Sequence, residues 1–257
     1  MAGPPFRTDD PQPVDYRHWE FYLASQYQKN TGGVSATAPH VEINYGVRPD
    51  FQLHLILPME YAKPRGQPSH YGYSDTELGL KWRFYSEKRK KFMAGSFPLV
   101  EIPTGEESRG LGNGAPQVFI PLWLQKEWGP WLSNVGGGYW FNSGAGHRDF
   151  QFLGAMVQRD VNRYWTLGAE IFYQTPSDSS GAHEVGFNAG GFLKLTKNQQ
   201  ILFTAGSDIH GPNSFFYYLA YYLTFGPGEE KGGLRTPGFQ KGWPHSSPVD
   251  IARLERE

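Results

Sequence analysis

The chain has 257 residues, and its 24 Lys and Arg nearly balance its 25 Asp and Glu, leaving a formal net charge of −1 at pH 7. This balance gives no indication of a nucleic-acid surface. The absence of cysteine excludes disulfides, thiol catalysis and cysteine-ligated zinc sites. Because its apolar runs are shorter than the roughly 20 residues of a membrane-spanning helix, a helical membrane protein is not expected.

Residues 1–16 contain proline and aspartate without periodicity, and we expect an extended N-terminal segment there. Its Arg7, Asp9 and Asp10 could fold back as a plug or a cap. No apolar stretch typical of a signal peptide follows Met1, so for an exported protein we expect this sequence to be the mature form.

Short segments that alternate apolar and polar residues come next, and the side chains of a β-strand repeat with a period of two. In the clearest of them, residues 75–84, Leu78 and Leu80 oppose Glu77 and Lys81. We expect twelve strands, at residues 18–26, 40–47, 51–62, 75–84, 92–103, 117–126, 131–142, 149–159, 165–174, 185–195, 201–208 and 215–225. The eighth of them is apolar on both faces, so its register stays open.

The connections between these strands alternate in length. We expect tight turns at residues 48–50, 86–91, 127–130, 160–164 and 196–199, and longer loops at residues 27–39, 63–74, 104–114 and 175–184. The connections after the seventh and eleventh strands are short, which makes the alternation imperfect. Outer-membrane barrels place short turns in the periplasm and long loops outside, and an even strand count then puts both termini in the periplasm.

These patterns predict an all-β fold, a 12-stranded antiparallel transmembrane β-barrel in up-and-down meander order. In eleven of the twelve segments the apolar face carries no charge, as a lipid-facing surface requires. The 18 Phe, 15 Tyr and 8 Trp would form aromatic girdles at both membrane interfaces. A soluble sandwich or closed soluble barrel remains the alternative, because it also hides charge from one face.

Three regions follow from this division of the chain. We expect the N-terminal segment at residues 1–16, the barrel at 17–225 and a flexible C-terminal tail at 226–257, rich in Gly, Pro and charge. The end of the tail, residues 249–257, could form one or two helical turns. A loop role is expected for residues 110–114 (GLGNG), since no helix follows to hold an anion.

Several of these segments resemble a bacterial outer-membrane transporter family that is often labelled as a component of the phenol meta-degradation pathway. The resemblance covers about residues 6–225 and is carried by residues 8–22 (TDDPQPVDYRHWEFY), 39–47 (PHVEINYGV), 71–84 (YGYSDTELGLKWRF), 97–105 (FPLVEIPTG) and 110–129 (GLGNGAPQVFIPLWLQKEWG). It implies a 12-stranded outer-membrane barrel and uptake of small, aromatic compounds, and carries over no catalytic residue. Phe225 would supply the terminal aromatic residue of such barrels, although a tail follows it here.

The polar faces of the expected strands collect ten ionisable side chains that we take as candidates for lining the lumen. They are Glu20, Glu42, His54, Glu60, Glu77, Lys81, Arg83, Glu101, Glu170 and Lys194. Rings of such charges set solute selectivity in channels. The alternative is that they pair with one another and fill the interior, as they do in small barrels.

An enzyme is a second hypothesis, because outer-membrane lipid hydrolases also use 12-stranded barrels. Such an enzyme needs a serine beside a histidine, and no expected strand carries both on one face. Ser207 and His210 lie at a strand end, and His245 and Ser246 lie in the tail. A soluble β-barrel ligand-binding protein is a third hypothesis, and it requires the polar faces to meet water.

The sequence therefore predicts a porin-like channel of the bacterial outer membrane, not an enzyme, for passive passage of small solutes such as aromatic or hydrophobic compounds. The expected partners are outer-membrane lipid, a small-molecule solute and the barrel assembly machinery, with no nucleic acid. No cofactor is expected, and no metal either, because the eight histidines show neither HxH nor HExxH spacing.

Overall fold

The structure is a computed structural model, and it describes residues 4–179 and 181–227. The expected tail, its helical turns and the pair His245 and Ser246 lie outside the described residues, apart from positions 226 and 227. Within the described residues no helix is long and apolar enough to cross a membrane.

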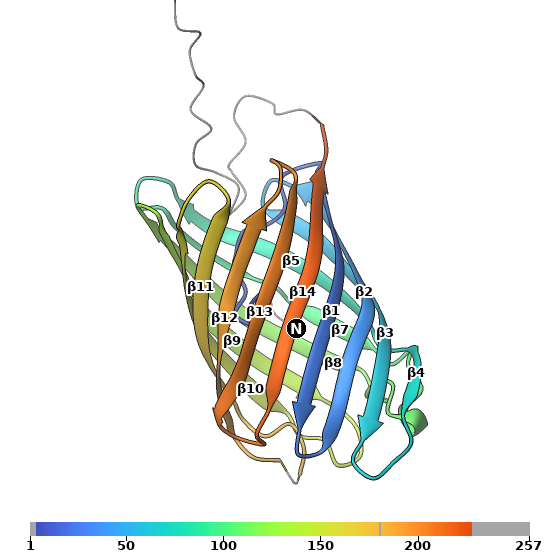
Figure 1. Ribbon diagram of the computed structural model, residues 1–257. Helices are drawn as coiled ribbons and strands as arrows, with labels where there is room; N and C mark the ends of the chain where they lie inside the picture. Colours follow the sequence, from blue (N-terminus) through green and yellow to red (C-terminus); the bar gives the residue numbers. More distant parts are fainter. Residues whose placement is uncertain (1–3, 180, 228–257) are drawn as a thin grey trace, which may run out of the picture.

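Within the described residues, fourteen strands form one antiparallel sheet, which Figure 1 shows curled into a barrel. The strands are β1 (Trp19–Asn30), β2 (Gly33–Arg48), β3 (Phe51–Pro64), β4 (His70–Tyr73), β5 (Thr76–Glu87), β6 (Phe92–Ser96), β7 (Leu99–Ile102), β8 (Gln117–Trp128), β9 (Trp131–Asn142), β10 (Phe150–Asp160), β11 (Trp165–Gln174), β12 (Glu184–Lys194), β13 (Gln199–His210) and β14 (Phe215–Phe225). A 3₁₀ turn, η1 (Glu107–Arg109), lies between β7 and β8.

The sheet closes into a barrel because β1 pairs with β14, from Trp19 opposite Phe225 to Lys29 opposite Phe215. Both β4 and β5 pair with β3, and both β6 and β7 pair with β5 and β8, so each of these two pairs fills one position in the wall. Fourteen strands therefore fill twelve positions, which confirms the predicted 12-stranded meander. Closure pairs the first strand with the last, so that neither has a free edge.

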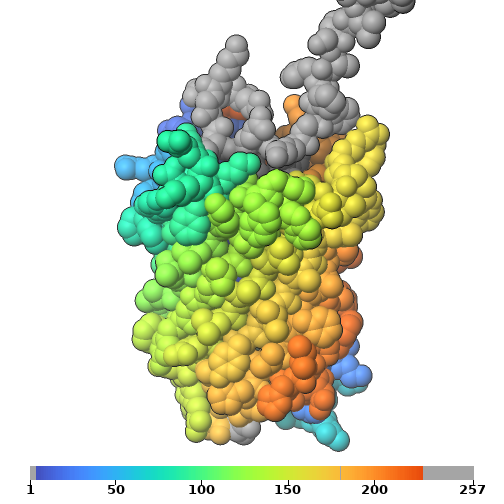
Figure 2. All heavy atoms as spheres, turned by 90° about the vertical axis from the view of Figure 1, so that its left-hand side faces the viewer, coloured from blue at the N-terminus to red at the C-terminus, as the bar shows by residue number. Residues whose placement is uncertain are grey.

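The outer surface of the barrel is apolar along the middle of the strands. Leu122, Leu153 and Ile171 are 50–53% exposed there, and Figure 2 shows this side of the barrel as a continuous wall of side chains. An apolar surface of this extent needs an apolar environment to cover it.

Exposed aromatic side chains lie on the outer surface towards both ends of the wall. At the barrel end where β1 begins, at Trp19, and β14 ends, at Phe225, they include Trp82, Trp128, Trp131, Tyr164 and Trp165. At the opposite end they include Tyr71, Tyr73, Tyr139, Phe141, Phe215 and Tyr217. Two aromatic bands that flank an apolar belt are typical of a barrel that spans a membrane.

The prediction of a long loop at residues 27–39 is wrong, because most of these residues belong to β1 and β2. These strands pair from Gln26 opposite Thr37 to Asn30 opposite Gly33, leaving a tight turn at Thr31. Alternation gave no signal there because the side chains are mostly polar or small, whereas a strand ladder needs only backbone hydrogen bonds. The alternation of loop lengths is therefore weaker than predicted.

Two further expectations need adjustment. The single strand predicted at residues 92–103 is split into β6 and β7 next to Pro98, which has no N–H to donate to a ladder. The open register at residues 149–159 is settled by β10, where Phe152 and Met156 are buried inside and Leu153 points outwards.

Candidate functional site: the barrel lumen

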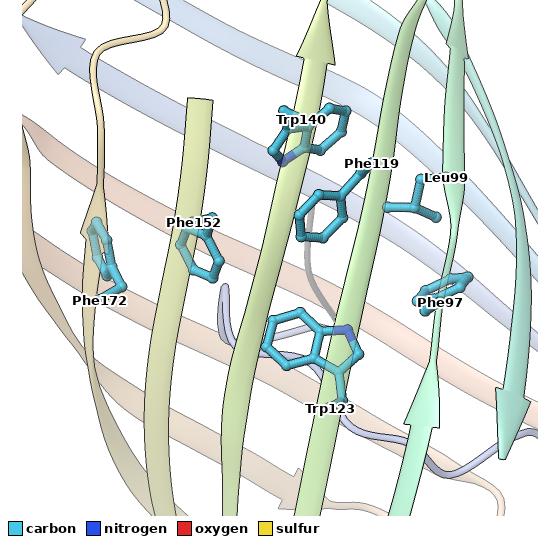
Figure 3. Packing of buried hydrophobic residues seen from close by; sticks show 7 residues of the cluster. All are labelled: Phe97, Leu99, Phe119, Trp123, Trp140, Phe152 and Phe172. Carbon is cyan, nitrogen blue, oxygen red and sulfur yellow. The ribbon is translucent and has the colours of Figure 1, made fainter. Parts of the chain in front are cut away.

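One half of the inner wall is aromatic. Side chains from the stretch between β6 and β7 through to β11 point into the barrel and form a buried row, shown in Figure 3: Phe97, Leu99, Phe119, Trp123, Trp140, Phe152 and Phe172. Phe150 and Phe216 pack against this row. We call these nine residues the aromatic wall.

Neighbouring rings of the aromatic wall contact one another across the strands. The ring centroids of Phe119 and Trp140 lie 4.7 Å apart, and those of Trp140 and Phe150 lie 5.7 Å apart. Phe172 continues the series, 6.0 Å from Phe152. At such separations ring pairs add about 0.5–1.5 kcal/mol each to the burial of their area, so the row is a preformed surface.

The opposite half of the inner wall is polar and hydrogen-bonded. Asn44 Nδ2 donates to Glu42 Oε1 at 2.8 Å, and the two ring nitrogens of His54 lie 2.6 Å from Asn44 Oδ1 and 2.9 Å from Glu77 Oε1. This chain joins β2, β3 and β5. Fully satisfied polar networks hold their members in fixed positions, so the acidic groups are presented at defined places.

A cavity of about 610 Å³ lies between the two halves. Its described lining carries eight carboxyl groups, Asp9, Asp10, Glu20, Glu42, Glu60, Asp75, Glu77 and Glu101, but two cationic side chains, Arg7 and Lys81. The volume is within the range of about 300–1,000 Å³ that is typical of small-molecule sites. A lining with this excess of acidic groups attracts cations.

Residues 4–16 run through the lumen and are largely buried, as at Phe6 and Val14. The Glu170 carboxylate of β11 accepts the backbone N–H groups of Arg7 at 2.8 Å and Thr8 at 2.7 Å. From β13, the Thr204 hydroxyl donates to a backbone carbonyl oxygen of the same segment at 2.7 Å. These bonds join the segment to the far wall of the barrel.

Three side chains of β3 and β5 hold the same segment. Lys81 Nζ lies 2.9 Å from Asp9 Oδ1 and 3.6 Å from Asp10 Oδ1. Arg83 Nη1 donates to Gln12 Oε1 at 2.7 Å. The backbone N–H of residue 14 donates to the side chain of Gln52 at 2.9 Å. The segment is thus held at several points along its length and crosses the lumen.

Two glycines in the wall leave room for this segment. A Cβ at Gly46 would collide with the backbone oxygens of Val14 and Asp15, and a Cβ at Gly154 would collide with the Thr8 hydroxyl. The wall lacks side chains at two places where the segment passes, so the two surfaces are complementary in shape.

The loop between β7 and β8 folds over the barrel end that lies away from Trp19 and Phe225. Asp75 accepts backbone N–H groups of Gly105 at 2.9 Å and Asn113 at 2.6 Å, and Leu111 is 1% exposed. Gly112 and Asn113 border the cavity. The GLGNG stretch therefore serves to narrow this end of the lumen.

The ten candidates from the sequence are found in two settings. Seven border the cavity: Glu20, Glu42, His54, Glu60, Glu77, Lys81 and Glu101. The others make contacts elsewhere. Arg83 pairs with Asp50 at 2.7 Å, Glu170 holds the N-terminal segment, and Lys194 pairs with Asp160 at 2.8 Å near the end of the wall.

The aromatic wall was not anticipated from the sequence, although a signal for it exists. In β8 the outward residues Ile120 and Leu122 alternate with Phe119 and Trp123, so both faces are apolar. A strand with one face towards lipid and apolar residues on the other has an apolar interior. The predicted fold rests on the outward, lipid-facing residues alone and does not include the apolar inner face of β8.

The hydrolase hypothesis gains no support from the described residues. Among them no serine hydroxyl forms a hydrogen bond with a histidine ring, and His147, for example, contacts the backbone oxygen of Ser143. The same part of the chain holds no group of three or more His, Cys, Asp or Glu side chains placed to bind a metal ion.

Solved structures similar to this chain include outer-membrane channels and porins. The COG4313 outer-membrane channel from Pseudomonas putida F1 superposes with a TM-score of 0.70 at 14% identity, covering 84% of this chain and 98% of that one. The KdgM porin in complex with oligogalacturonate gives 0.58 at 12%, covering 80% and 99%. The NanC porin gives 0.56 at 7%, covering 79% and 98%.

At these identities the likeness establishes the fold alone, a closed antiparallel β-barrel. No protein-family model matches the chain, and no curated protein matches it.

Proposed function

We propose that this protein is a channel of the bacterial outer membrane, and not an enzyme, through which small solutes pass passively. The observation that carries the proposal is the cavity of about 610 Å³ inside a closed barrel. The apolar belt and the two aromatic bands on the outside support a position across the membrane. The similar structures, an outer-membrane channel and two porins, support it as well.

The proposal includes an orientation and partners. The barrel wall begins, at Trp19, and ends, at Phe225, on the periplasmic side, with the tight turns on the same side, as in barrels with an even strand count. Lipid of the outer membrane surrounds the apolar belt. Phe225, at the end of the last strand, provides the aromatic residue that the barrel assembly machinery would meet.

The solutes that suit this lumen carry an aromatic or otherwise apolar part. The aromatic wall offers faces for stacking, while the opposite half offers hydrogen-bond acceptors. Small aromatic compounds, such as those implied by the resemblance to the phenol-pathway transporters, are therefore our preferred class. Their passage is limited by residues 4–16 and by the β7–β8 loop, which both project into the lumen.

The experiment that tests this function is single-channel recording in a planar bilayer with detergent-refolded protein. We expect discrete conductance with a preference for cations, and Glu60→Lys should shift the reversal potential towards anions because Glu60 borders the cavity. Glu127→Lys, on the end of β8 outside the cavity lining, is the matched control. A folded, inserted protein that conducts nothing would overturn the channel proposal.

A further inference from the structure

The side chain of Arg7 lies in a cradle on the aromatic wall. Its Cζ atom is 4.2 Å from the ring centroid of Phe172 and 5.2 Å from that of Phe152. Its Nη2 donates to Gln174 Oε1 at 2.8 Å, and its Nη1 lies 3.7 Å from Glu184 Oε2. The guanidinium thus has aromatic faces beside it and two oxygen acceptors around it.

The backbone and the side chain of Arg7 are held separately. Glu170 accepts the backbone N–H groups of Arg7 and Thr8, whereas the guanidinium bonds to Gln174. The Arg7 side chain is 35% exposed and borders the cavity, whereas Phe6 and Thr8 beside it are buried. The guanidinium can therefore leave its cradle while the segment stays in place, and Phe152 and Gln174 of the cradle border the cavity.

The cradle has the chemistry of a site for flat cations. Aromatic faces attract cations within about 6 Å of the ring centroid, and a planar guanidinium also stacks on them. Glu184 keeps a second oxygen, Oε1, that is buried and accepts no hydrogen bond. An acceptor of this kind is costly to leave unused, and a ligand with more than one N–H donor would satisfy it.

The surroundings favour a cation as well. Eight carboxyl groups and two cationic side chains border the cavity, and one of these two, Lys81, is paired with Asp9 at 2.9 Å. Arg7 is the other. A cationic solute that displaced the Arg7 side chain would therefore enter a lumen with an excess of negative charge.

We infer that Phe152, Phe172, Gln174 and Glu184 form a binding site for flat organic cations that carry an amidinium or guanidinium group, and that Arg7 occupies it when no such solute is bound. The inference deepens the proposed function, because the solute must reach the lumen. Arg7 then acts as an internal competitor. Because a cationic solute can bind only while the cradle is empty, its apparent affinity is the intrinsic affinity multiplied by the fraction of time the cradle is empty.

The test is calorimetric titration of the protein in detergent micelles with benzamidine, an aromatic amidinium, and with benzamide, its uncharged analogue. Arg7→Ala should bind benzamidine about tenfold more tightly than the unaltered protein, since a cradle filled nine-tenths of the time costs that factor. Benzamide should bind no more tightly to the variant. Equal benzamidine affinity in both proteins would overturn the inference.

Two further variants locate the effect. Arg7→Ala combined with Phe172→Leu keeps the apolar volume and removes the ring face, so the gain in benzamidine affinity should be lost. Asp9→Asn loosens the segment at Lys81 and leaves Arg7 in its cradle, so its benzamidine affinity should match that of the unaltered protein. A gain that survives Phe172→Leu, or that Asp9→Asn reproduces, would contradict the assigned site.

Binding in micelles requires no conduction, so the two proposals fail separately. A protein that gains benzamidine affinity in Arg7→Ala but carries no current keeps the cation site and loses the channel. A conducting protein without that gain keeps the channel and loses the site.

Discussion

At the scale of single residues, Glu170 determines where the N-terminal segment lies. Its carboxylate accepts two backbone N–H groups, from Arg7 and Thr8, and also the side-chain amide of Asn188. Hydrogen bonds to a charged group contribute about 1.5–3 kcal/mol each. An acidic residue buried to 3% exposure is thus matched by donors that come mostly from a distant part of the chain.

Replacing Glu170 by glutamine tests this role. Gln keeps one acceptor oxygen and loses the charge, so we expect the hold on the segment to weaken by about 1–2 kcal/mol. The ratio of open to closed time in single-channel records should then rise about tenfold, since about 1.4 kcal/mol corresponds to a factor of ten. Glu127→Gln should leave the ratio unchanged, and no change in Glu170→Gln would exclude the assigned role.

The sequence predicts which face of its strand such a residue occupies, but it does not predict the residue's hydrogen-bond partners. Alternation along β11 places Glu170 on the inner face, with the apolar residues Ile171 and Leu167 outside. Two of its partners, Arg7 and Thr8, are separated from it by more than 160 positions along the chain. Periodicity describes one strand at a time, so it cannot show which segment crosses a closed lumen.

At the scale of elements, the strands were predicted best where one face meets an apolar environment. The segments at 131–142, 165–174 and 215–225 agree with β9, β11 and β14 to the residue. The prediction failed at the β1–β2 hairpin, where backbone pairing continues through polar residues. It also missed the separate strand β4, four residues that pair with β3 inside an expected loop.

The outward face of β8 gives a direct test of burial in lipid. Leu122 lies in the middle of the strand and is 50% exposed, so Leu122→Arg should destabilise the barrel by about 2–4 kcal/mol in a bilayer. Leu195 follows the end of β12 and is 48% exposed, and there the same change should cost about 0–1 kcal/mol. Reversible unfolding in liposomes measures both, and equal costs would contradict the membrane position.

At the scale of the whole molecule, the lumen combines an apolar and an acidic half within one wall. The aromatic wall comes from β7 to β11 and their flanks, with Phe216 of β14, whereas the acidic groups come mainly from β1 to β7. The described cavity lining has six more carboxyl groups than Lys and Arg side chains, the difference between eight and two. Such a lumen should select on both charge and aromatic character.

This charge distribution predicts a cation preference that depends on ionic strength. The Debye length falls from about 10 Å at 0.1 M salt to about 3 Å at 1 M, so the carboxyl groups are screened at high salt. Reversal potentials in KCl gradients should show a larger ratio of cation to anion permeability around 0.1 M than around 1 M. An anion preference at low salt would be incompatible with the described lining.

The most direct test is to measure single-channel conductance after a disulfide bond has joined the N-terminal segment to the wall. The chain has no cysteine, and Thr8 Cβ lies 3.2 Å from the position of a Cβ at Gly154, close to the range of about 3.5–4.5 Å found in disulfides. In Thr8→Cys with Gly154→Cys we expect low single-channel conductance after oxidation and a severalfold increase after reduction, with no response in Gly154→Cys alone. Conductance that is the same in the oxidised and the reduced double variant would contradict a lumen narrowed by this segment.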